Sequence, residues 1–403
     1  MGNQADRSGP SPEYDVVVVG GGITGCATAY RLAAAGSSVL LVERSDLNTQ
    51  GSGRNAGSLH GQLQFEPYRV NGRRWALDYL PALRLLVDSL AIWRGLDEEL
   101  GVDLEVATKG GLLVADSDAL ADAVAEKVRF ESEHGFAAEL VTGAALRRLA
   151  PYLSDKVVAA HLSPVEGKTN PLLAAPALAR AAVRHGADVR TGTQVLAVDP
   201  LDGGGFEVRT STTTARCARV VLTAGAALPA LAEPLGFDLP ITDEPVQVHA
   251  TQSVAPVIPH LVYYAGGRLT LKQAVTGTLL IGGGWPATVD PVSGHPTVSA
   301  DSMRRNLRIA QVVAPWIGSV NVIRAWAGVG NATPDLLPLI GESASVPGAF
   351  VGMFPHMGLT AGPLMGELLA TLVQGRDPGR DLTPFAPDRF AIPRPPRPAQ
   401  PAA

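Results

Sequence analysis

The chain has 403 residues, of which 46% are hydrophobic, so it can bury a large core and is long enough for two domains. Its formal net charge of −5 offers no basic surface for nucleic acid or anionic lipid. The two cysteines, Cys26 and Cys217, lie in no CxxC pair or Cys/His cluster, which argues against a disulfide framework and against a metal site such as zinc.

The ends of the chain differ in composition from the rest. Residues 1–13 are polar and rich in Gly, Ser and Pro, without the apolar stretch of a signal peptide, and we expect a disordered tail. The first apolar run, Val16–Val19, is too short for a bilayer, and no uninterrupted segment approaches the roughly eighteen apolar residues of a membrane helix. A Pro-rich tail, expected over 387–403, is predicted to be unstructured from Ile392. We therefore expect a soluble, cytoplasmic protein with no membrane span.

A βαβ pattern begins the chain. Asp15–Val19 contains four consecutive β-branched valines, as in a strand buried in a parallel sheet. Ile23–Ala35 is predicted to be a helix of small residues that Gly36 ends, and Ser38–Val42 a second strand.

Helical and strand patterns then alternate along the chain. We expect helices over Leu80–Leu100, Ser117–His134, Leu172–His185, Met303–Val313 and Gly362–Leu372. We expect a hairpin over Leu104–Val114 that turns at Lys109–Gly111, and strands over Asp188–Val198, Phe206–Arg209, Ala218–Thr223, Gln247–Gln252, Leu269–Gln273 and Thr278–Gly282.

This order predicts an α/β fold (α+β overall), in which one domain is assembled from separated segments. Rossmann-like pieces occur at the start, middle and end of the chain, with antiparallel-looking strands between them. We therefore expect a Rossmann-like dinucleotide-binding domain over 14–98, 152–242 and 325–386. An inserted substrate domain on a mostly antiparallel sheet would comprise 99–151 and 243–324.

The first glycine-rich turn has the form GxGxxG, at Gly20, Gly22 and Gly25. Gly20 permits the tight turn, Gly22 lets the backbone approach a pyrophosphate, and Gly25 lets the helix pack close to the strand. Ile23 and Thr24 begin the helix, whose unpaired N–H groups bind phosphate. The turn therefore predicts a site for the ADP half of a dinucleotide.

An acidic residue at the end of the second strand makes this prediction more specific. Glu43, followed by Arg44, can accept hydrogen bonds from the adenosine ribose, and its carboxylate would repel a 2′-phosphate. A GxGxxG motif alone is a weak signal in a chain with 44 glycines. Its place between an apolar strand and a helix, ahead of Glu43, is a strong one.

The turn by itself does not separate NAD from FAD, but the segments after it favour FAD. The small-residue loop Gly51–His60, with one arginine, suits close backbone approach to a long cofactor. Near the C-terminus, Thr333–Gly341 (TPDLLPLIG), Pro347–Gly352 (PGAFVG) and His356–Thr360 (HMGLT) lead into a helix. An NAD(P)-dependent dehydrogenase would leave these blocks unexplained.

In this order, the motifs resemble those of the D-amino-acid oxidase/glycine oxidase/sarcosine oxidase (DAO) superfamily of flavoproteins, over roughly residues 14–380. The likeness rests on the fingerprint, the Ser/Gly/Arg loop, Val220–Gly225, and the TPDxLPxIG and HxGLT blocks. Arg54–His60 (RNAGSLH), Gly167–Pro171 (GKTNP) and Leu279–Pro286 (LLIGGGWP) further resemble β subunits of heteromeric amino-acid and opine dehydrogenases.

The resemblance implies FAD as cofactor and adds contacts to those of the fingerprint. The helix N-terminus at Gly358 would point its N–H groups at the flavin O2 region. Some relatives tether the flavin through His or Cys, but the C-terminal block has no Cys and His60 lies beyond the usual site, so we expect non-covalent FAD. The further implied contacts are Arg54, Asn55, Ala56, Gly57, Val195, Ala224, Gly225, Gly358, Leu359 and Thr360.

The resemblance also implies the reaction, in which a C–N bond is oxidised by hydride transfer from the α-carbon to flavin N5. The protein has to place the Cα–H bond, keep the amine neutral and fix the carboxylate, so a conventional acid–base residue is not required. Many relatives carry a carboxylate-binding Arg before the TPD block, where this chain has none in Gly328–Thr333. The replacement cations that we consider are Arg268, Lys272 and Arg324, with Tyr263, Tyr264, His60 and His356 as further candidates near flavin or substrate.

Two functions fit these observations. The first is an oxidase or dehydrogenase of an amino acid or secondary amine (an N-substituted amino acid, imino acid or opine), with oxygen or a redox partner as electron acceptor. The second is a flavin-carrying β subunit in a heteromeric dehydrogenase that passes electrons to a partner rather than to oxygen. A homo- or hetero-oligomer fits either function.

Overall fold

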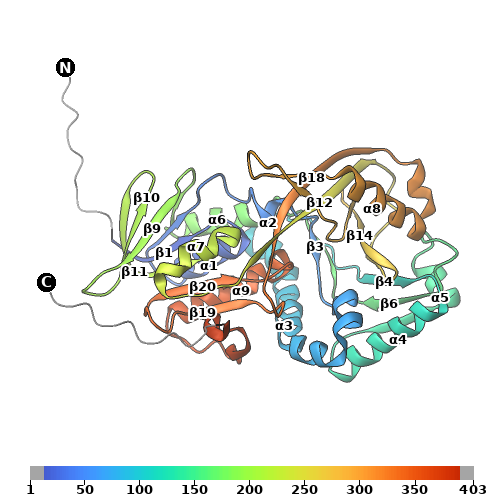
Figure 1. Cartoon of the computed structure of the whole chain (residues 1–403), viewed down its shortest axis with the longest axis horizontal. Helices are drawn as coiled ribbons and strands as arrows, with labels where there is room; N and C mark the ends of the chain where they lie inside the picture. Colours follow the sequence, from blue (N-terminus) through green and yellow to red (C-terminus); the bar gives the residue numbers. More distant parts are fainter. Residues whose placement is uncertain (1–12, 391–403) are drawn as a thin grey trace, which may run out of the picture.

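The computed structural model describes residues 13–390, which form two lobes, each built around an eight-stranded sheet (Figure 1). The tails predicted over 1–13 and 387–403 lie largely outside the described residues. The exceptions are Glu13, which begins the first strand, and Pro387–Phe390, a 3₁₀ turn. Arg389 in this turn is paired with Asp335 (Nε–Oδ2 2.8 Å), so the ordered chain continues past the predicted start of the tail.

The first sheet has a parallel core, as predicted from its β-branched strands. Its order is β19-β20-β11-β1-β2-β8, parallel from β20 to β8. Strand β19 is antiparallel at one edge, and a β9–β10 hairpin extends from β11. The strands are β1 (Glu13–Val19), β2 (Val39–Val42), β8 (Asp188–Arg190), β9 (Val195–Pro200), β10 (Phe206–Thr210), β11 (Thr214–Leu222), β19 (Leu339–Glu342) and β20 (Ala349–Met353).

Helices of small and branched apolar residues cover this sheet. Helix α1 (Ile23–Ala34) packs against α6 (Ala174–Arg184) and α9 (Gly358–Val373), and α9 also packs against α3 (Phe65–Leu100). Two glycines of α9 allow the close approach of α1. A Cβ on Gly362 would lie 2.5 Å from Ile23 Cγ2, and one on Gly366 would lie 2.4 Å from Ala27 Cβ.

The second sheet is mostly antiparallel, which confirms that prediction. Its order is β18-β12-β15-β14-β13-β4-β6-β5, and β13–β4 is its parallel pair. The strands are β4 (Gly111–Ala115), β5 (Glu139–Thr142), β6 (Ala159–Ser163), β12 (Thr242–Ser253), β13 (Leu261–Tyr264), β14 (Gly267–Gln273), β15 (Thr278–Gly282) and β18 (Val322–Ala332). Helix α4 (Asp118–Glu133) packs against β4 and β6, and α8 (Ala300–Val313) against β14 and β15 (Figure 1).

Short elements connect the two sheets. Strand β3 (Ser58–Leu59) pairs with β7 (Gly167–Lys168), which brings the loop after the first βαβ unit against the second lobe. The remaining α-helices and strands of the described residues are α2 (Gly51–Arg54), α5 (Gly143–Leu149), α7 (Leu228–Ala232), β16 (Thr288–Val289) and β17 (Pro296–Thr297). Within residues 13–390, no helix has the length and apolar character needed to cross a membrane.

Several elements differ from their predictions. The hairpin over Leu104–Val114 is wrong, because β4 begins at Gly111 and pairs with the distant strands β6 and β13. The strand expected over Asp188–Val198 is two strands that belong to different parts of the first sheet. The helix expected from Leu80 begins at Phe65, with a kink at Gly72 (φ +72°).

The predicted domain boundaries remain a proposal, and the strand pairing refines them. Strand β6 lies within 152–242 and most of β18 within 325–386, both assigned to the dinucleotide-binding domain. Both strands pair in the second sheet. Pairing partners so far away in the sequence leave no local signal, so the sequence alone does not separate these two strands from their neighbours.

Candidate active site

A continuous cleft of about 1380 Å³ runs from the first glycine-rich turn to the face of the second sheet. At one end it is lined by the turn after β1, by Glu43 after β2 and by Thr223–Ala227 after β11. At the other end it is lined by residues of β13, β14 and β18. The cleft thus begins at the carboxyl ends of parallel strands, where ligands of open α/β sheets bind.

The glycine-rich turn is shaped as the sequence predicts. Gly20 has φ +111°, and a Cβ there would lie 2.7 Å from Thr223 O. A Cβ on Gly25 would lie 1.9 Å from Gly20 O, so only glycine lets α1 start so close to β1. Around Gly22, by contrast, a Cβ would meet Ser52 Oγ at 3.0 Å and otherwise point into open space. This side of Gly22 has the room that a pyrophosphate requires.

Glu43 holds the turn through backbone hydrogen bonds. Its Oε2 accepts from Gly21 N (2.7 Å) and its Oε1 from Ser45 N (2.9 Å). A carboxylate has about four acceptor sites, so acceptor capacity remains for ribose hydroxyls. The neighbouring Arg44 is exposed on the rim of the cleft.

The loop after β2 is fixed by its own polar side chains. Arg54 Nε donates to Thr49 O (2.7 Å), and Asn55 Nδ2 donates to Ser52 O (2.6 Å). Gly57 has φ +76°, and a Cβ there would lie 2.1 Å from Thr169 O. The predicted cofactor residues that line the cleft are Gly20, Gly22, Ile23, Thr24, Glu43, Arg44, Arg54, Asn55, Ala56, Val195, Ala224, Gly225, Gly358, Leu359 and Thr360, whereas Gly25 and Gly57 act by permitting close packing.

The N-terminus of α9 faces the middle of the cleft. Gly358, Leu359 and Thr360 line it, and Thr360 Oγ1 accepts from His60 N (3.0 Å). The carbonyl of Thr360 accepts from Ser89 Oγ (2.6 Å) and Trp93 Nε1 (2.9 Å) of the buried helix α3. The helix N-terminus is therefore rigidly held beside His60, where its dipole favours negative charge.

His60 lies between this helix and the second sheet. Its Nδ1 is 2.7 Å from the hydroxyl of Tyr263 on β13. Burial and the nearby Lys272 ammonium lower the pKa of His60 to about 3, so the ring is neutral at pH 7. His356 also lines the cleft, with Nδ1 3.6 Å from Glu244 Oε2, and burial lowers its pKa.

The three candidate cations occupy different places. Arg268 lines the cleft, where its Nε is 3.3 Å from Glu66 Oε2. Lys272 and Arg324 instead line a second cavity of about 660 Å³. Of these three alternatives, Arg268 is therefore the one that lines the cleft. Lys272 lies beyond the part of β14 that lines the cleft (Gly267–Thr270), and Arg324 lies before the part of β18 that does (Gly328–Asn331).

Lys272 nevertheless lies close to the cleft. It is 1% exposed, and its Nζ donates to Ser58 Oγ (2.7 Å), a residue that does line the cleft. Burial, with a smaller effect of Lys168, lowers the pKa of Lys272 to about 7. Tyr264 lines the cleft and donates to Asp116 Oδ2 (2.8 Å).

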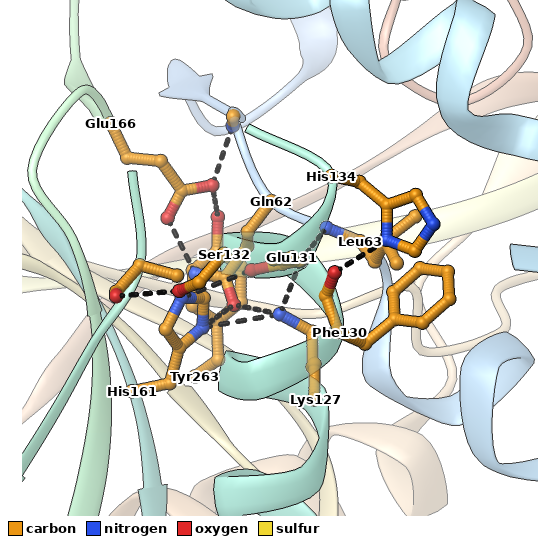
Figure 2. A network of polar contacts seen from close by, with 12 residues as sticks. Gln62, Leu63, Lys127, Phe130, Glu131, Ser132, His134, His161, Glu166 and Tyr263 are labelled. Carbon is orange, nitrogen blue, oxygen red and sulfur yellow. Dashed lines mark hydrogen bonds and ion pairs between the residues drawn. The ribbon is translucent and has the colours of Figure 1, made fainter. Parts of the chain in front are cut away.

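A buried polar network that no sequence motif predicts adjoins Tyr263 (Figure 2). Glu166 Oε1 accepts from Gly61 N (2.7 Å) and Tyr263 Oη (3.0 Å), and its Oε2 accepts from Gln62 Nε2 (2.7 Å). Lys127 Nζ contacts Gln62 Oε1 (2.9 Å) and Glu131 Oε1 (2.8 Å). Glu166 follows no motif and lies in a loop, so it carries no signal in a single sequence.

No cluster of three or more His, Cys, Asp or Glu side chains suitable for a metal ion occurs within residues 13–390. Cys26 and Cys217 are both free and buried.

Comparisons with known proteins agree with this geometry. The model of the family described as FAD dependent oxidoreductase (DAO) matches residues 15–372. The chain is 30% identical to a glycine oxidase of Pseudomonas aeruginosa, over 92% of this chain and 98% of the relative. It is 27% identical to the β subunit of a sarcosine oxidase of Rhizobium meliloti, over 94% and 89% respectively. The crystal structure of a glycine oxidase from Geobacillus kaustophilus superposes with a TM-score of 0.82 at 25% identity, covering 94% of this chain and 100% of that one.

Proposed function

The chain belongs to the FAD dependent oxidoreductase (DAO) family, and on that premise we propose that it oxidises the C–N bond of an amino acid or secondary amine. The observation that supports this most is the continuity of the cleft. It joins a dinucleotide-binding turn to a chamber lined by His60, Tyr263 and Arg268.

The residues of the cleft fit FAD. The open side of Gly22 and the N-terminus of α1 would hold the pyrophosphate, and Glu43 the ribose. The N-terminus of α9 at Gly358 would face the flavin ring. Cys26 and Cys217 are buried and do not line the cleft, and His60 Nδ1 already contacts Tyr263, so we expect FAD to be held without a covalent bond.

When bound, FAD supplies the electron acceptor, taking a hydride from the α-carbon at N5. The chain's own residues then have three tasks: to orient the substrate, to exclude water and to keep the amine neutral. Arg268 would bind a substrate carboxylate, since its guanidinium offers the paired donors that a carboxylate accepts. The neutral His60 would face the amine. The substrate class is an amino acid, an N-substituted amino acid, an imino acid or an opine.

A second candidate is the flavin-carrying β subunit of a heteromeric dehydrogenase. The likeness to two polypeptides of Rhizobium meliloti supports it, since one is the β subunit of a sarcosine oxidase and the other a subunit of an opine oxidase, both 27% identical. The second cavity supports it as well, because Leu172 (59% exposed) and Val275 (67% exposed) on its rim are apolar and open to a partner. Co-purification of a second polypeptide, or turnover with dyes but not with oxygen, would distinguish this function from that of an independent oxidase.

Anaerobic reduction of the bound flavin tests both candidates. The purified protein is mixed with D-, L-, N-methyl and cyclic amino acids, and loss of flavin absorbance is followed. Bleaching by one of these classes supports C–N oxidation and names the substrate class. A protein that holds FAD but bleaches with none of them contradicts the proposal.

A further inference from the structure

Oxidation of an amine by hydride transfer also requires the loss of a proton. An amino acid carries an ammonium group at neutral pH, and the hydride leaves readily only when the nitrogen lone pair is free. The substrate must therefore release one proton before or during the transfer. If the proposed function holds, the site needs a place to which that proton can go.

His60 lines the cleft but cannot keep the proton by itself. No hydrogen bond within the described residues uses its Nε2, so this atom is available to a ligand. Burial and Lys272 lower its pKa to about 3, which opposes a lasting positive charge on the ring. Because the ring stays neutral, His60 can bind a proton at Nε2 only if it gives up the proton on Nδ1.

A short chain of contacts leads from Nδ1 into the protein. The Tyr263 hydroxyl is 2.7 Å from His60 Nδ1 and 3.0 Å from Glu166 Oε1, and both distances suit a hydrogen bond. Glu166 is 0% exposed and does not line the cleft, so Tyr263 connects the cleft wall to a carboxylate that substrate does not reach (Figure 2).

The backbone at the start of β4 makes room for this carboxylate. A Cβ on Gly111, the first residue of β4, would lie 1.7 Å from Glu166 Oε2, so that any other residue there would displace Glu166. Three donors hold the carboxylate in place: Gly61 N, Gln62 Nε2 and Tyr263 Oη.

The groups around Glu166 leave it able to take up a proton near neutral pH. Burial raises its pKa to about 7, although the three donors and Lys127 act in the opposite direction. The charge of Lys127 is largely matched by Glu131, 2.8 Å away on the same helix. His161 on β6 also faces this network, and burial and Lys127 lower its pKa to about 4, so it is neutral. Lys272 acts on the pKa of His60 and is not among the groups that shift the pKa of Glu166.

We propose that His60, Tyr263 and Glu166 form a proton relay that accepts the substrate's ammonium proton and stores it on Glu166. The proton binds Nε2 of His60 while the Nδ1 proton passes to the Tyr263 oxygen and the Tyr263 proton passes to Glu166 Oε1. His60 changes tautomer, Tyr263 is unchanged, the substrate loses one proton and Glu166 gains one. His60 touches the substrate, whereas Tyr263 and Glu166 act through it.

Replacing the central hydroxyl tests the relay. Tyr263→Phe removes one donor to Glu166 and leaves the other two. Tyr152→Phe is the control, because the Tyr152 hydroxyl is likewise paired with a histidine (2.8 Å to His260 Nδ1), whereas neither Tyr152 nor His260 lines a cavity described above. The measurement is the rate of anaerobic flavin reduction by a saturating substrate between pH 6 and 10.

In the wild-type protein and in Tyr152→Phe, the rate should rise with pH through about 7, as Glu166 ionises. In Tyr263→Phe, the rate at pH 7.5 should be lower by roughly 100-fold, the lower range for loss of a general base. It should recover as the pH approaches the pKa of the substrate amine itself. A Tyr263→Phe profile that coincides with that of Tyr152→Phe would overturn the relay.

Infrared difference spectroscopy of the wild-type protein gives a second readout that does not depend on a rate. Anaerobic mixing with substrate at pH 8 should produce the C=O band of a protonated carboxyl group while the flavin is being reduced, and Glu166→Gln should abolish it. Absence of this band in the wild-type protein during flavin reduction overturns storage on Glu166. Failure of the wild-type flavin to be reduced by any amine contradicts the proposed function instead, so the two failures are distinguishable.

Discussion

The hydroxyl of Tyr263 lies 2.7 Å from Nδ1 of His60, although 203 positions separate the two residues in the sequence. His60 follows the loop of the first βαβ unit, and Tyr263 lies near the end of β13 in the second sheet. One wall of the cleft is therefore formed by residues from both lobes. The chemistry that we assign to the site therefore depends on the second sheet as well as on the dinucleotide-binding fold.

Replacement of His60 should separate chemistry from cofactor binding. His60→Gln should retain FAD, because the residue's backbone N–H, which bonds Thr360 Oγ1, is unchanged. Its rate of flavin reduction at pH 7.5 should fall roughly 100-fold, since the relay loses its first member. His260→Gln is the control, as His260 pairs with Tyr152 away from the cleft. Equal reduction rates in the two variants would show that His60 does not contact the amine.

Gly22→Val should abolish FAD retention. Apart from Ser52 Oγ at 3.0 Å, the side chain would occupy the open space assigned to the pyrophosphate. Gly95→Val, in α3, is the control, because a Cβ there meets nothing within 4 Å and the residue does not line the cleft. The FAD-to-protein ratio of the purified, folded variants is measured. A stoichiometric flavin content in Gly22→Val would refute the assignment.

Glu43→Ala should weaken FAD binding without abolishing it. The change removes acceptors for the ribose and also frees Gly21 N, to which Glu43 Oε2 is bonded at 2.7 Å. We expect a loss of about 1–3 kcal/mol, or roughly five- to 150-fold in Kd. Titration of apoprotein with FAD, followed by flavin fluorescence, measures it. An unchanged Kd would mean that the carboxylate serves the turn alone.

Arg268→Ala should raise KM or lower kcat/KM by about thirty- to a thousand-fold, the worth of roughly 2–4 kcal/mol for a charged hydrogen bond. FAD binding should not change. The control is Arg73→Ala, which removes another exposed arginine that forms a 3.3 Å pair with a glutamate. Should Lys272→Ala or Arg324→Ala have this effect instead, the substrate carboxylate would lie toward the second cavity. If the best substrate is a neutral amine, the carboxylate clamp is not needed at all.

Glu166 should make stability depend on pH in a defined direction. Its pKa is raised to about 7 in the folded protein, so folding favours its protonated form. As the pH rises from about 4.5 to 7, the unfolded chain loses this proton first, and the folded state is destabilised by on the order of 3 kcal/mol. The free energy of unfolding of the wild type, relative to Glu166→Gln, should fall by that amount over this range. A difference that stays constant with pH contradicts the raised pKa.

The sequence predicted the shape of the glycine-rich turn, because the determinants of that shape are local. Gly20, Gly22 and Gly25 are required by the backbone geometry of one turn, and Glu43 follows within a single βαβ unit. The family resemblance added the N-terminus of α9. These features depend on short-range spacing, which a single sequence records directly.

The substrate side was predicted less well, because its geometry depends on long-range pairing. Arg268 and Lys272 are four positions apart on β14, so alternation does not separate them; their places along the sheet do, and these depend on the pairing of β14 with β13 and β15. Glu166 reaches Tyr263 through the pairing of β4 with β6 and β13 and through the space above Gly111. Neither contact leaves a motif in the sequence.

The central claim is that this chain is an FAD enzyme that oxidises amino-acid or amine C–N bonds. Anaerobic titration of the purified yellow protein with the panel of D-, L-, N-methyl and cyclic amino acids tests it most directly. We predict that at least one class bleaches the flavin fully, and that acid or heat then releases FAD into the supernatant. A flavin that stays oxidised with every member of the panel would contradict the account.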